Sequence, residues 1–371
     1  MLKTAGLGLA TLGVPAWAEL GNKIVLGQSA AFTGPASALG DQFKKGAQLL
    51  FDKVNSRGGV GGRLIELQSL DDGYEPERCS ANTRKLIDSG VFALFGYIGT
   101  PTSLAALPLA TQAQLPFVAP FTGAEALRTP LNRYAFHVRA SYFNETAEIV
   151  KQLAAVNIRK IAVFYQNDSY GKAGLEGVKR ALSPLGLEPA ALGTVERNTV
   201  AVDAAVASIV AAKPDAIVQI SAYKSCAAFI RAARKAGFGG TFYNVSFVGT
   251  QALASELGAD GRGVVVSQVM PFPFSPATAV ATEYLDAGKA AIGEKFQPNY
   301  SSIEGYVAAK TLVEGLRRAG ARPTADSLIG GLEAMHEFDL GGFRVDFSAQ
   351  KHAGSKFVDL TILSADGRVR H

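Results

Sequence analysis

The chain has 371 residues, of which 48% are hydrophobic and 19% charged, and its formal net charge is +5. This length exceeds one ordinary core and favours two domains, and the composition is that of a globular protein rather than a disordered one. The mild positive charge is spread along the sequence, without a basic run interleaved with aromatic residues. We therefore expect no nucleic-acid partner.

The first residues have the pattern of a secretory signal peptide. Lys3 precedes a weakly hydrophobic stretch from Ala5 to Val14, and Ala16-Trp17-Ala18 forms a small-residue cleavage motif. We expect residues 1–18 to be removed near Ala18 during export to the periplasm, by either the general secretory or the twin-arginine route. No later segment reaches the roughly 18 uninterrupted apolar residues that a membrane-spanning helix needs.

From residue 24 onward, short β-branched or apolar runs alternate with longer segments of helical periodicity, and the rhythm restarts at Lys160. The predicted strands are 24–27, 64–70, 92–97, 117–119, 161–165, 187–195, 216–220, 241–245 and 263–269. The predicted helices between them are 41–55, 77–89, 102–113, 171–182, 201–212 and 224–236. Alternation of strands and helices implies parallel pairing. The sequence therefore predicts an α/β protein with two doubly wound parallel sheets.

The last hundred residues are less regular, and several prolines interrupt the pattern after residue 270. Helices are predicted at 278–292, 302–318 and 325–333, followed by extended segments at 343–347 and 357–363. Strands that follow a helical block suggest that the chain recrosses between the lobes. We expect crossings near Ser141, Pro271 and Phe338, which make a three-strand hinge. The predicted lobes are residues 23–141 plus 271–337, and residues 142–270 plus 338–371.

The motifs of common catalytic sites are missing from the sequence. The four histidines have no metal-ligand spacing, and no G-x-S-x-G turn occurs. The glycine-rich run 58–62 follows a helix and precedes a strand, the reverse of a phosphate-binding loop, so it is interpreted as a helix end and turn. Cys79 and Cys226 lie on predicted helices of different lobes and are expected to be buried free thiols. The sequence therefore predicts no enzyme, no catalytic residue, no metal and no cofactor.

Ligands of open α/β sheets bind beyond the carboxyl ends of the strands. The run 96–103 combines Tyr97 with Thr100, Thr102 and Ser103 at the start of a helix, where hydroxyl and backbone N–H groups favour a carboxylate. The next predicted strand, 117–119, is followed by residues 120–124 at the same edge of the sheet. In the second lobe, the strand ends at 167–171, 221–223 and 244–247 carry tyrosine, serine and asparagine. The strand ends together predict a cleft with aromatic walls and hydrogen-bonding groups.

These segments also carry a family resemblance. The runs IVLGQSAAFTGPASALGDQFKKGAQLLFDKVNSRGGVGGRLIEL, GYIGTPTS, PFVAPFTGA, KIAVFYQNDSYG and AAFIRAARKAGF occur in the order and spacing found in leucine/isoleucine/valine-type periplasmic binding proteins. The chain resembles this family from about Lys23 to Arg368. The resemblance implies the type I periplasmic binding protein fold and delivery of a solute to an ABC importer. With the strand-end argument, it predicts the ligand-binding residues Leu39, Tyr97, Thr100, Thr102, Phe121, Gly123, Tyr170, Tyr223 and Ser246.

Two departures from the family pattern bear on the ligand. The first-lobe disulfide of the family would need cysteines at the positions of Tyr74 and Gly99. The acid that pairs with the α-amino group of an amino-acid ligand corresponds to Ser246, and a buried ammonium without a carboxylate is costly. The resemblance therefore points to an aromatic or aliphatic carboxylate, or to a branched-chain amino acid if Asp168 or Glu304 supplies the charge.

The sequence thus predicts an extracytoplasmic solute-binding protein of an ABC importer. It is expected to be monomeric, to capture a small carboxylate-bearing molecule between its lobes and to meet the permease subunits at the membrane. A second hypothesis is a ligand-sensing receptor subunit that feeds a signalling partner. A third is a cytosolic α/β enzyme. Neighbouring permease and ATPase genes would favour transport over sensing.

Overall fold

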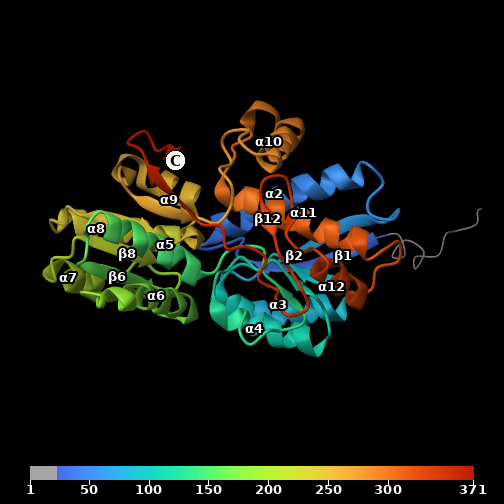
Figure 1. Ribbon diagram of the computed structural model, residues 1–371, viewed down its shortest axis with the longest axis horizontal. Helices are drawn as coiled ribbons and strands as arrows, with labels where there is room; N and C mark the ends of the chain where they lie inside the picture. The colour runs from blue at the N-terminus through green and yellow to red at the C-terminus, as the bar shows by residue number, and fades with distance from the viewer. Residues whose placement is uncertain (1–22) are drawn as a thin grey trace, which may run out of the picture.

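The computed structural model describes residues 23–371, so the predicted signal peptide at 1–18 lies outside the described residues. Two sheets, each covered by helices, form two lobes (Figure 1). Within the described part of the chain, no helix combines the length and apolar character needed to cross a bilayer.

The first sheet has the strand order β2-β1-β3-β4-β5, and all of its pairs are parallel. Its strands are β1 (Lys23–Ala30), β2 (Leu64–Asp71), β3 (Ala93–Phe95), β4 (Phe117–Val118) and β5 (Ala135–Phe136). The connecting helices are α2 (Ser37–Asn55), α3 (Pro76–Asp88) and α4 (Thr100–Gln112), with a short 3-10 turn η1 (Glu125–Leu127). The predicted parallel α/β winding is confirmed, and the short strand β5 is an addition to it.

The second sheet has the order β14-β13-β10-β9-β8-β6-β7. Its strands are β6 (Ile161–Gln166), β7 (Leu192–Val195), β8 (Ala216–Ile220), β9 (Thr241–Asn244), β10 (Val265–Gln268), β13 (Asp359–Leu363) and β14 (Val369–Arg370). The helices are α5 (Tyr142–Ala155), α6 (Ser169–Leu182), α7 (Asp203–Ala211), α8 (Tyr223–Lys235) and α9 (Thr250–Leu257), with the 3-10 turns η2 (Ser183–Leu185), η3 (Ser246–Val248) and η4 (Gly258–Gly261). The pairs of β6 to β10 are parallel, whereas β13 and β14 join the edge in antiparallel orientation.

The chain then returns to the first lobe. Its elements there are α10 (Ala279–Ile292), η5 (Gly293–Lys295), α11 (Tyr300–Arg318), α12 (Ala325–Glu333), β11 (Phe338–Asp339) and β12 (Arg344–Val345). Helix α11 lies along α2 so closely that a Cβ on Gly46 would stand 1.7 Å from the carbonyl oxygen of Ser302. This contact excludes any side chain at position 46 and locks the returning segment onto the first sheet.

The third crossing of the chain lies later than the predicted position near Phe338. Strands β11 and β12 pair with each other, and the Phe347 amide donates to the Met335 carbonyl at 3.0 Å, at the end of the α12 segment. The second sheet is joined only at β13, where Asp359 pairs with Gln268. The local hairpin and its anchor to Met335 therefore keep residues 338–347 beside the first lobe.

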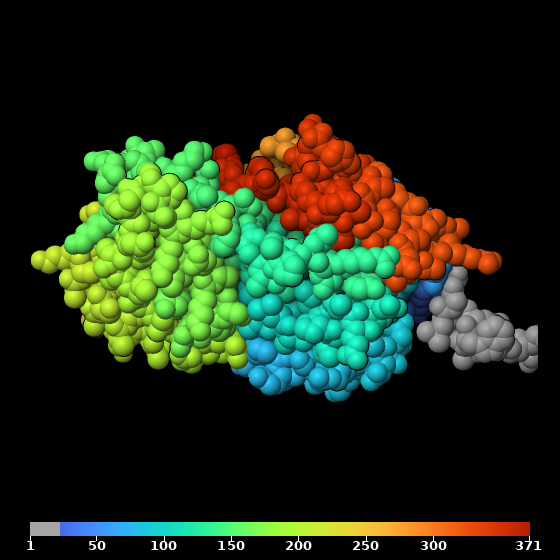
Figure 2. Space-filling model, turned by 60° about the horizontal axis from the view of Figure 1, so that its bottom comes forward, coloured from blue at the N-terminus to red at the C-terminus, as the bar shows by residue number. Residues whose placement is uncertain are grey.

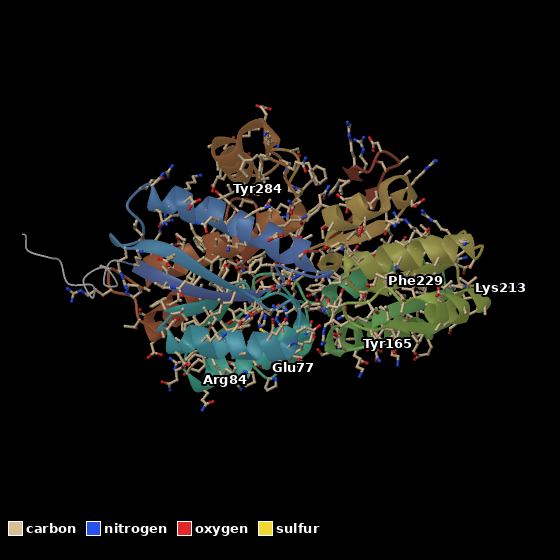
Figure 3. The ribbon with its side chains drawn as sticks, turned by 180° about the vertical axis from the view of Figure 1, so that it is seen from behind. Glu77, Arg84, Tyr165, Lys213, Phe229 and Tyr284 are labelled. Atoms are coloured by element: carbon tan, nitrogen blue, oxygen red, sulfur yellow. The ribbon has the colours of Figure 1, made fainter. Side chains whose placement is uncertain are left out.

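The two lobes lie side by side and touch. Figure 1 places α5 to α9 in one lobe and α2, α3, α4, α11 and α12 in the other, with α10 projecting above α2. Figure 2 shows the yellow-green lobe against the cyan and blue one without an open channel on that face. Seen from behind in Figure 3, Glu77 and Arg84 lie on the lower face of the first lobe, and Lys213 lies at the outer end of the second.

Candidate functional site: a cleft closed between the lobes

Polar contacts along one rim hold the two lobes together. Arg197, which follows β7, donates from Nη2 to Glu75 Oε2 at 2.8 Å, just before α3. Asn198 Nδ2 reaches Glu75 Oε1 at 2.7 Å and the Gly73 carbonyl at 3.0 Å. These contacts join the loop after β2 to the loop after β7. The cleft between the lobes is therefore closed in this structure.

The space remaining at the centre of the cleft is small. A cavity of about 10 Å³ is lined by Phe121, Ser246, Gln268, Val269, Met270, Tyr300, Ser301 and Glu304. A cavity of this size holds about one water molecule. A larger solute therefore enters only when the lobes separate, which is the hinge bending that a multiply crossed boundary allows.

Hydroxyl groups of the first lobe gather where α4 begins. The Thr100 and Thr122 hydroxyls lie 2.6 Å apart, and Thr122 Oγ1 lies 3.4 Å from the Tyr142 hydroxyl at the start of α5. Gly99, with φ of 99°, makes the sharp entry into α4 that brings Thr100 to this position. A chain of hydroxyls thus runs from the first lobe to the second along one end of the cleft.

Aromatic rings from both lobes form the wall of the cleft. The Phe247 ring, in the turn after β9, has its centroid 5.6 Å from Phe121, 5.9 Å from Tyr74 and 4.6 Å from Tyr170. The Tyr142 ring lies 5.4 Å from that of Tyr170. Aromatic pairs at these distances contribute beyond simple area burial. Because the rings come from opposite lobes, closing the cleft is what assembles this wall.

A buried arginine lies at the centre of the closed cleft. Arg139, in the crossing between β5 and α5, is 1% exposed, and its guanidinium lies 4.6 Å from the centroid of the Phe121 ring. Its Nη2 donates to the Ser246 hydroxyl, whereas Nε and Nη1 are buried without a hydrogen-bond partner among the described residues. An unpaired buried donor costs about 1–3 kcal/mol. Arg139 Nε and Nη1 are therefore available to donate hydrogen bonds to a ligand in the cleft.

Two buried carboxylates from opposite lobes face this guanidinium. Glu145 Oε1 lies 3.7 Å from Arg139 Nη2, and Glu304 Oε1 lies 3.6 Å from Arg139 Nε. Glu145 is placed one turn into α5, whose first turn is set by a capping box between Ser141 and Asn144. Its Oε2 accepts from the Ser246 amide and the Ser267 hydroxyl, at 2.7 Å and 2.6 Å, while Oε1 has no hydrogen-bond partner among the described residues.

The electrostatics of the cluster follow from burial and from mutual pairing. Burial raises the pKa of the Glu304 carboxyl to about 7, although the Arg139 charge opposes the shift. Burial acts to lower the pKa of Arg139, but the Glu304 and Glu145 carboxylates outweigh it and the net shift is upward. The cluster thus contains one permanent cation, while Glu304 changes charge near neutral pH. Such a centre can bind a carboxylate at Arg139 and an ammonium group at a glutamate.

The structure brings six of the predicted ligand-binding residues to this cleft: Leu39, Thr100, Phe121, Gly123, Tyr170 and Ser246. A Cβ on Gly249 of the second lobe would lie 2.4 Å from Leu39 Cδ2, and the Gly123 carbonyl accepts from the Tyr142 amide at 2.7 Å. Tyr223 begins α8 and is buried, next to the Ser221–Ser225 hydroxyl pair. These placements are compatible with ligand contact by the predicted residues, and that contact stays a prediction.

Tyr97 and Thr102 are directed elsewhere. The Tyr97 ring lies 4.9 Å from Phe117 in the smaller core of the first lobe, and its hydroxyl pairs with Thr83. The Thr102 hydroxyl turns back to the carbonyls of Ile98 and Gly99. Tyr97 is therefore part of the core of the first lobe, and the Thr102 side chain is used in forming the start of α4.

The structure also places five further positions that the sequence singled out. Tyr74 packs its ring on Gly99, where a Cβ would stand 2.2 Å from Tyr74 Cε2, so the two residues at the positions of the family's first-lobe disulfide are in direct contact. Cys79 and Cys226 are free and buried in different lobes, as predicted. Asp168 caps α6 and pairs with Arg197 at 3.4 Å, so it belongs to the rim rather than to the centre.

Sequence reasoning missed four residues of the site: Tyr74, Arg139, Tyr142 and Glu145. Arg139, Tyr142 and Glu145 lie within or just after the first crossing, where no strand end was predicted and helix α5 was not recognised. The signal that was available is the Ser141-x-x-Asn144 spacing, since serine and asparagine at this distance mark a helix start.

Two lobes, three crossings and a closed cleft that contains the unpaired polar groups define a hinged solute-binding protein. The chain belongs to the periplasmic binding protein family, whose model matches residues 23–368. The relatives that share this family are solute-binding proteins and not enzymes.

Solved structures and curated sequences agree with this assignment. A possible leucine/isoleucine/valine-binding protein from Rhodopirellula baltica SH 1 is 33% identical, with a TM-score of 0.90, over 96% of this chain and 97% of that one. A substrate-binding periplasmic protein from Ralstonia solanacearum is 32% identical, with a TM-score of 0.88, over 94% and 99%. Leu/Ile/Val-binding protein homolog 7 of Brucella abortus (strain 2308) is 25% identical over 315 residues, which are 80% of this chain and 77% of that protein.

Proposed function

We propose that this protein is the exported solute-binding component of an ABC importer and that it captures a small carboxylate-bearing molecule between its lobes. The observation that supports the carboxylate is Arg139, a fully buried cation at the centre of the cleft, two of whose nitrogens have no hydrogen-bond partner within residues 23–371. Charge-assisted hydrogen bonds to a guanidinium are among the strongest available to a carboxylate. The Thr100 and Thr122 hydroxyls lie at the same cleft and can supply further donors.

The remainder of the ligand depends on the two glutamates. Ser246 takes the position of the acid expected for an amino-acid ligand, but Glu145 lies directly behind it and binds its backbone amide. Glu304 comes from α11 of the first lobe, and its Oε1 lies 3.6 Å from Arg139 Nε. An amino acid would place its ammonium group at one of these carboxylates and its carboxylate at Arg139. The names of relatives as Leu/Ile/Val-binding proteins favour this alternative over an acid that lacks an amino group.

The test is a thermal-shift screen of the mature chain with branched-chain amino acids, aromatic acids and short aliphatic acids. A ligand at 100 times its dissociation constant stabilises the folded state by about 2.7 kcal/mol, which raises the melting temperature measurably. Each acid is paired with its methyl ester, which keeps the size of the solute and removes the negative charge. We expect stabilisation by at least one acid and by none of the esters. Equal stabilisation by an ester would contradict the role of the carboxylate.

We further propose export and cleavage near Ala18, on the pattern of Lys3, the stretch 5–14 and the motif 16–18. Mass spectrometry of the chain recovered from the periplasm of an expressing cell gives the first residue directly. A mature protein that begins at Glu19 is expected, and an intact N-terminus on the recovered protein would contradict the proposal.

A further inference from the structure

A second and larger cavity lies where the lobes join, separate from the cleft. Its volume is about 830 Å³, and it shares no lining residue with the closed cleft. The first lobe contributes η1 and the residues up to Ala135, and the second lobe contributes the start of α5 together with Arg180 of α6. Residues 350–356, which precede β13, form the third wall. We call this space the hinge cavity.

The charge of the hinge cavity is strongly one-sided. Its lining residues include four cations, namely Arg128, Arg180, Lys351 and Lys356, and a single acid, Glu125. Lys351 is paired with Asp346 at 2.5 Å. The other three cations have no acidic oxygen within 4.0 Å among the described residues. The start of α5 also faces this space, and a helix N-terminus adds partial positive charge.

Among the cations of the hinge cavity, Arg128 is buried and has no acidic partner among the described residues. It is 9% exposed, and its Nη2 donates to the carbonyls of Arg139 and Ala140 at 3.0 Å and 3.2 Å. Its Nε is buried with no hydrogen-bond partner among the described residues. Burial lowers the pKa of this guanidinium to about 10. A buried cation that is paired only with carbonyls is costly, and an anion placed beside it would offset that cost.

His137 adds a second unpaired group to the same wall. Its Nε2 lies 2.9 Å from the Leu127 carbonyl, and its buried Nδ1 has no partner among the described residues. Burial, together with the Arg128 charge, lowers the pKa of His137, so the ring is neutral. With Nε2 carrying the proton, Nδ1 is an acceptor. It can receive a hydrogen bond from an ion that bears both hydroxyl and anionic oxygens, as phosphate does.

We propose that the hinge cavity binds a small oxyanion of the phosphate type, held by Arg128, Arg180 and Lys356. These three residues come from the first lobe, the second lobe and the segment entering the second sheet. An ion that touches all three is sensitive to the angle between the lobes. The affinity for this ion therefore differs between the open and closed forms. By thermodynamic linkage, the ion changes the affinity for the solute by the same factor by which the solute changes the affinity for the ion.

The experiment titrates inorganic phosphate into the mature full-length chain by calorimetry, in chloride buffers of constant ionic strength. The test variant R180Q/K356Q removes two exposed cations from the cavity. The control variant K172Q/K295Q removes the same charge from exposed positions outside it, one on the same helix α6 and one on η5. Because all four side chains are exposed, both variants are expected to melt within about 2 °C of the wild type in chloride.

Phosphate is expected to bind the wild type and K172Q/K295Q equally and R180Q/K356Q at least 10-fold more weakly. No binding of phosphate to the wild type would overturn the proposal. Equal weakening in the test and control variants would also overturn it, because net charge alone would explain the result. Solute binding in the cleft is measured separately, so failure here leaves the proposed function intact.

Discussion

Arg139 Nε and Glu304 Oε1 lie 3.6 Å apart, at the distance of an ion pair but without a hydrogen bond between them. The arginine belongs to the first crossing of the chain and the glutamate to the helix α11 that packs on the first lobe. Both side chains are buried, so their charges compensate each other in a medium of low dielectric constant. A ligand can therefore separate Arg139 from Glu304 only if its own charged groups compensate the charges of the two side chains.

The first prediction concerns the stability of this cluster. R139M leaves Glu145 and Glu304 buried without a cation, and loss of one partner of a buried pair costs about 3–5 kcal/mol. We expect the free energy of unfolding, measured with urea, to fall by this amount. The double variant R139M/E304Q should recover at least about 1 kcal/mol, since a glutamine needs no counter-charge.

The control for this series is R231M. Arg231 pairs with Asp260 at 3.0 Å within the second lobe, where both side chains are about half exposed. Exposed pairs contribute about 0–1 kcal/mol, so R231M should change the unfolding free energy by less than 1 kcal/mol. An R139M variant as stable as R231M would show that the buried cluster is not charged in the way described.

The second prediction concerns pH. The pKa of Glu304 in the folded protein is about 7, above its ordinary value of 4.5. A carboxyl with a raised pKa favours folding while it is protonated, and this contribution is lost as pH rises through the folded pKa. The unfolding free energy of the wild type, minus that of E304Q, should therefore decrease between about pH 5 and pH 7 and be constant above about pH 8.

Taking the difference cancels the contributions of other shifted groups, such as the buried Asp72 and His137, because both proteins contain them. From the size of the shift, the total change is on the order of 3 kcal/mol. Urea unfolding at half-unit intervals of pH gives the curve. A difference that does not vary with pH would mean that Glu304 keeps an ordinary pKa.

The third prediction links pH to the chemistry of the solute. A carboxylate without an amino group adds negative charge beside Glu304 and should favour its protonated form. Its affinity is then expected to fall by up to about 10-fold per unit between pH 7 and pH 8. An amino acid whose ammonium group pairs with Glu304 favours the ionised form, so its affinity should rise between pH 6 and pH 7.

Isothermal titration at pH 6, 7 and 8, in buffers of different ionisation enthalpy, measures both affinity and proton uptake. E304Q serves as the matched control, in which the proton linkage should vanish for either class of ligand. If linkage of the same size persists in E304Q, the proton is exchanged at another group.

The fourth prediction concerns the rim. Arg197 and Glu75 hold the lobes together at 2.8 Å, and both side chains are partly exposed, so the contact contributes roughly 1 kcal/mol to closure. R197A should weaken solute binding by about 5-fold and increase the radius of gyration measured by X-ray scattering. R231A, which removes an arginine pair inside one lobe, should change neither quantity. A normal affinity in R197A would show that the rim contributes nothing to closure.

Most of the fold could be predicted from the sequence, because its signals are local. The helices at α3, α8 and α12 begin and end within about a residue of their predicted bounds, since apolar periodicity and turn residues act over a few positions. The parallel winding follows from the alternation of those elements. The third crossing was misplaced because a hairpin at 338–345 has the same extended pattern as a strand of the second sheet.

The chain by itself thus determined two wound lobes, the strand ends that face the cleft and the family resemblance. Tertiary structure alone decided what lies at the centre of that cleft. Glu304 is far in sequence from Arg139 and Glu145, and each of the three has the pattern of an ordinary charged residue of a helix or loop. Only the folding of α5, α11 and the first crossing against one another removes the three side chains from water. For that reason the pKa values of Arg139 and Glu304 are shifted, and polar atoms of Arg139 and Glu145 lack hydrogen-bond partners among the described residues. No local pattern of residues records such burial.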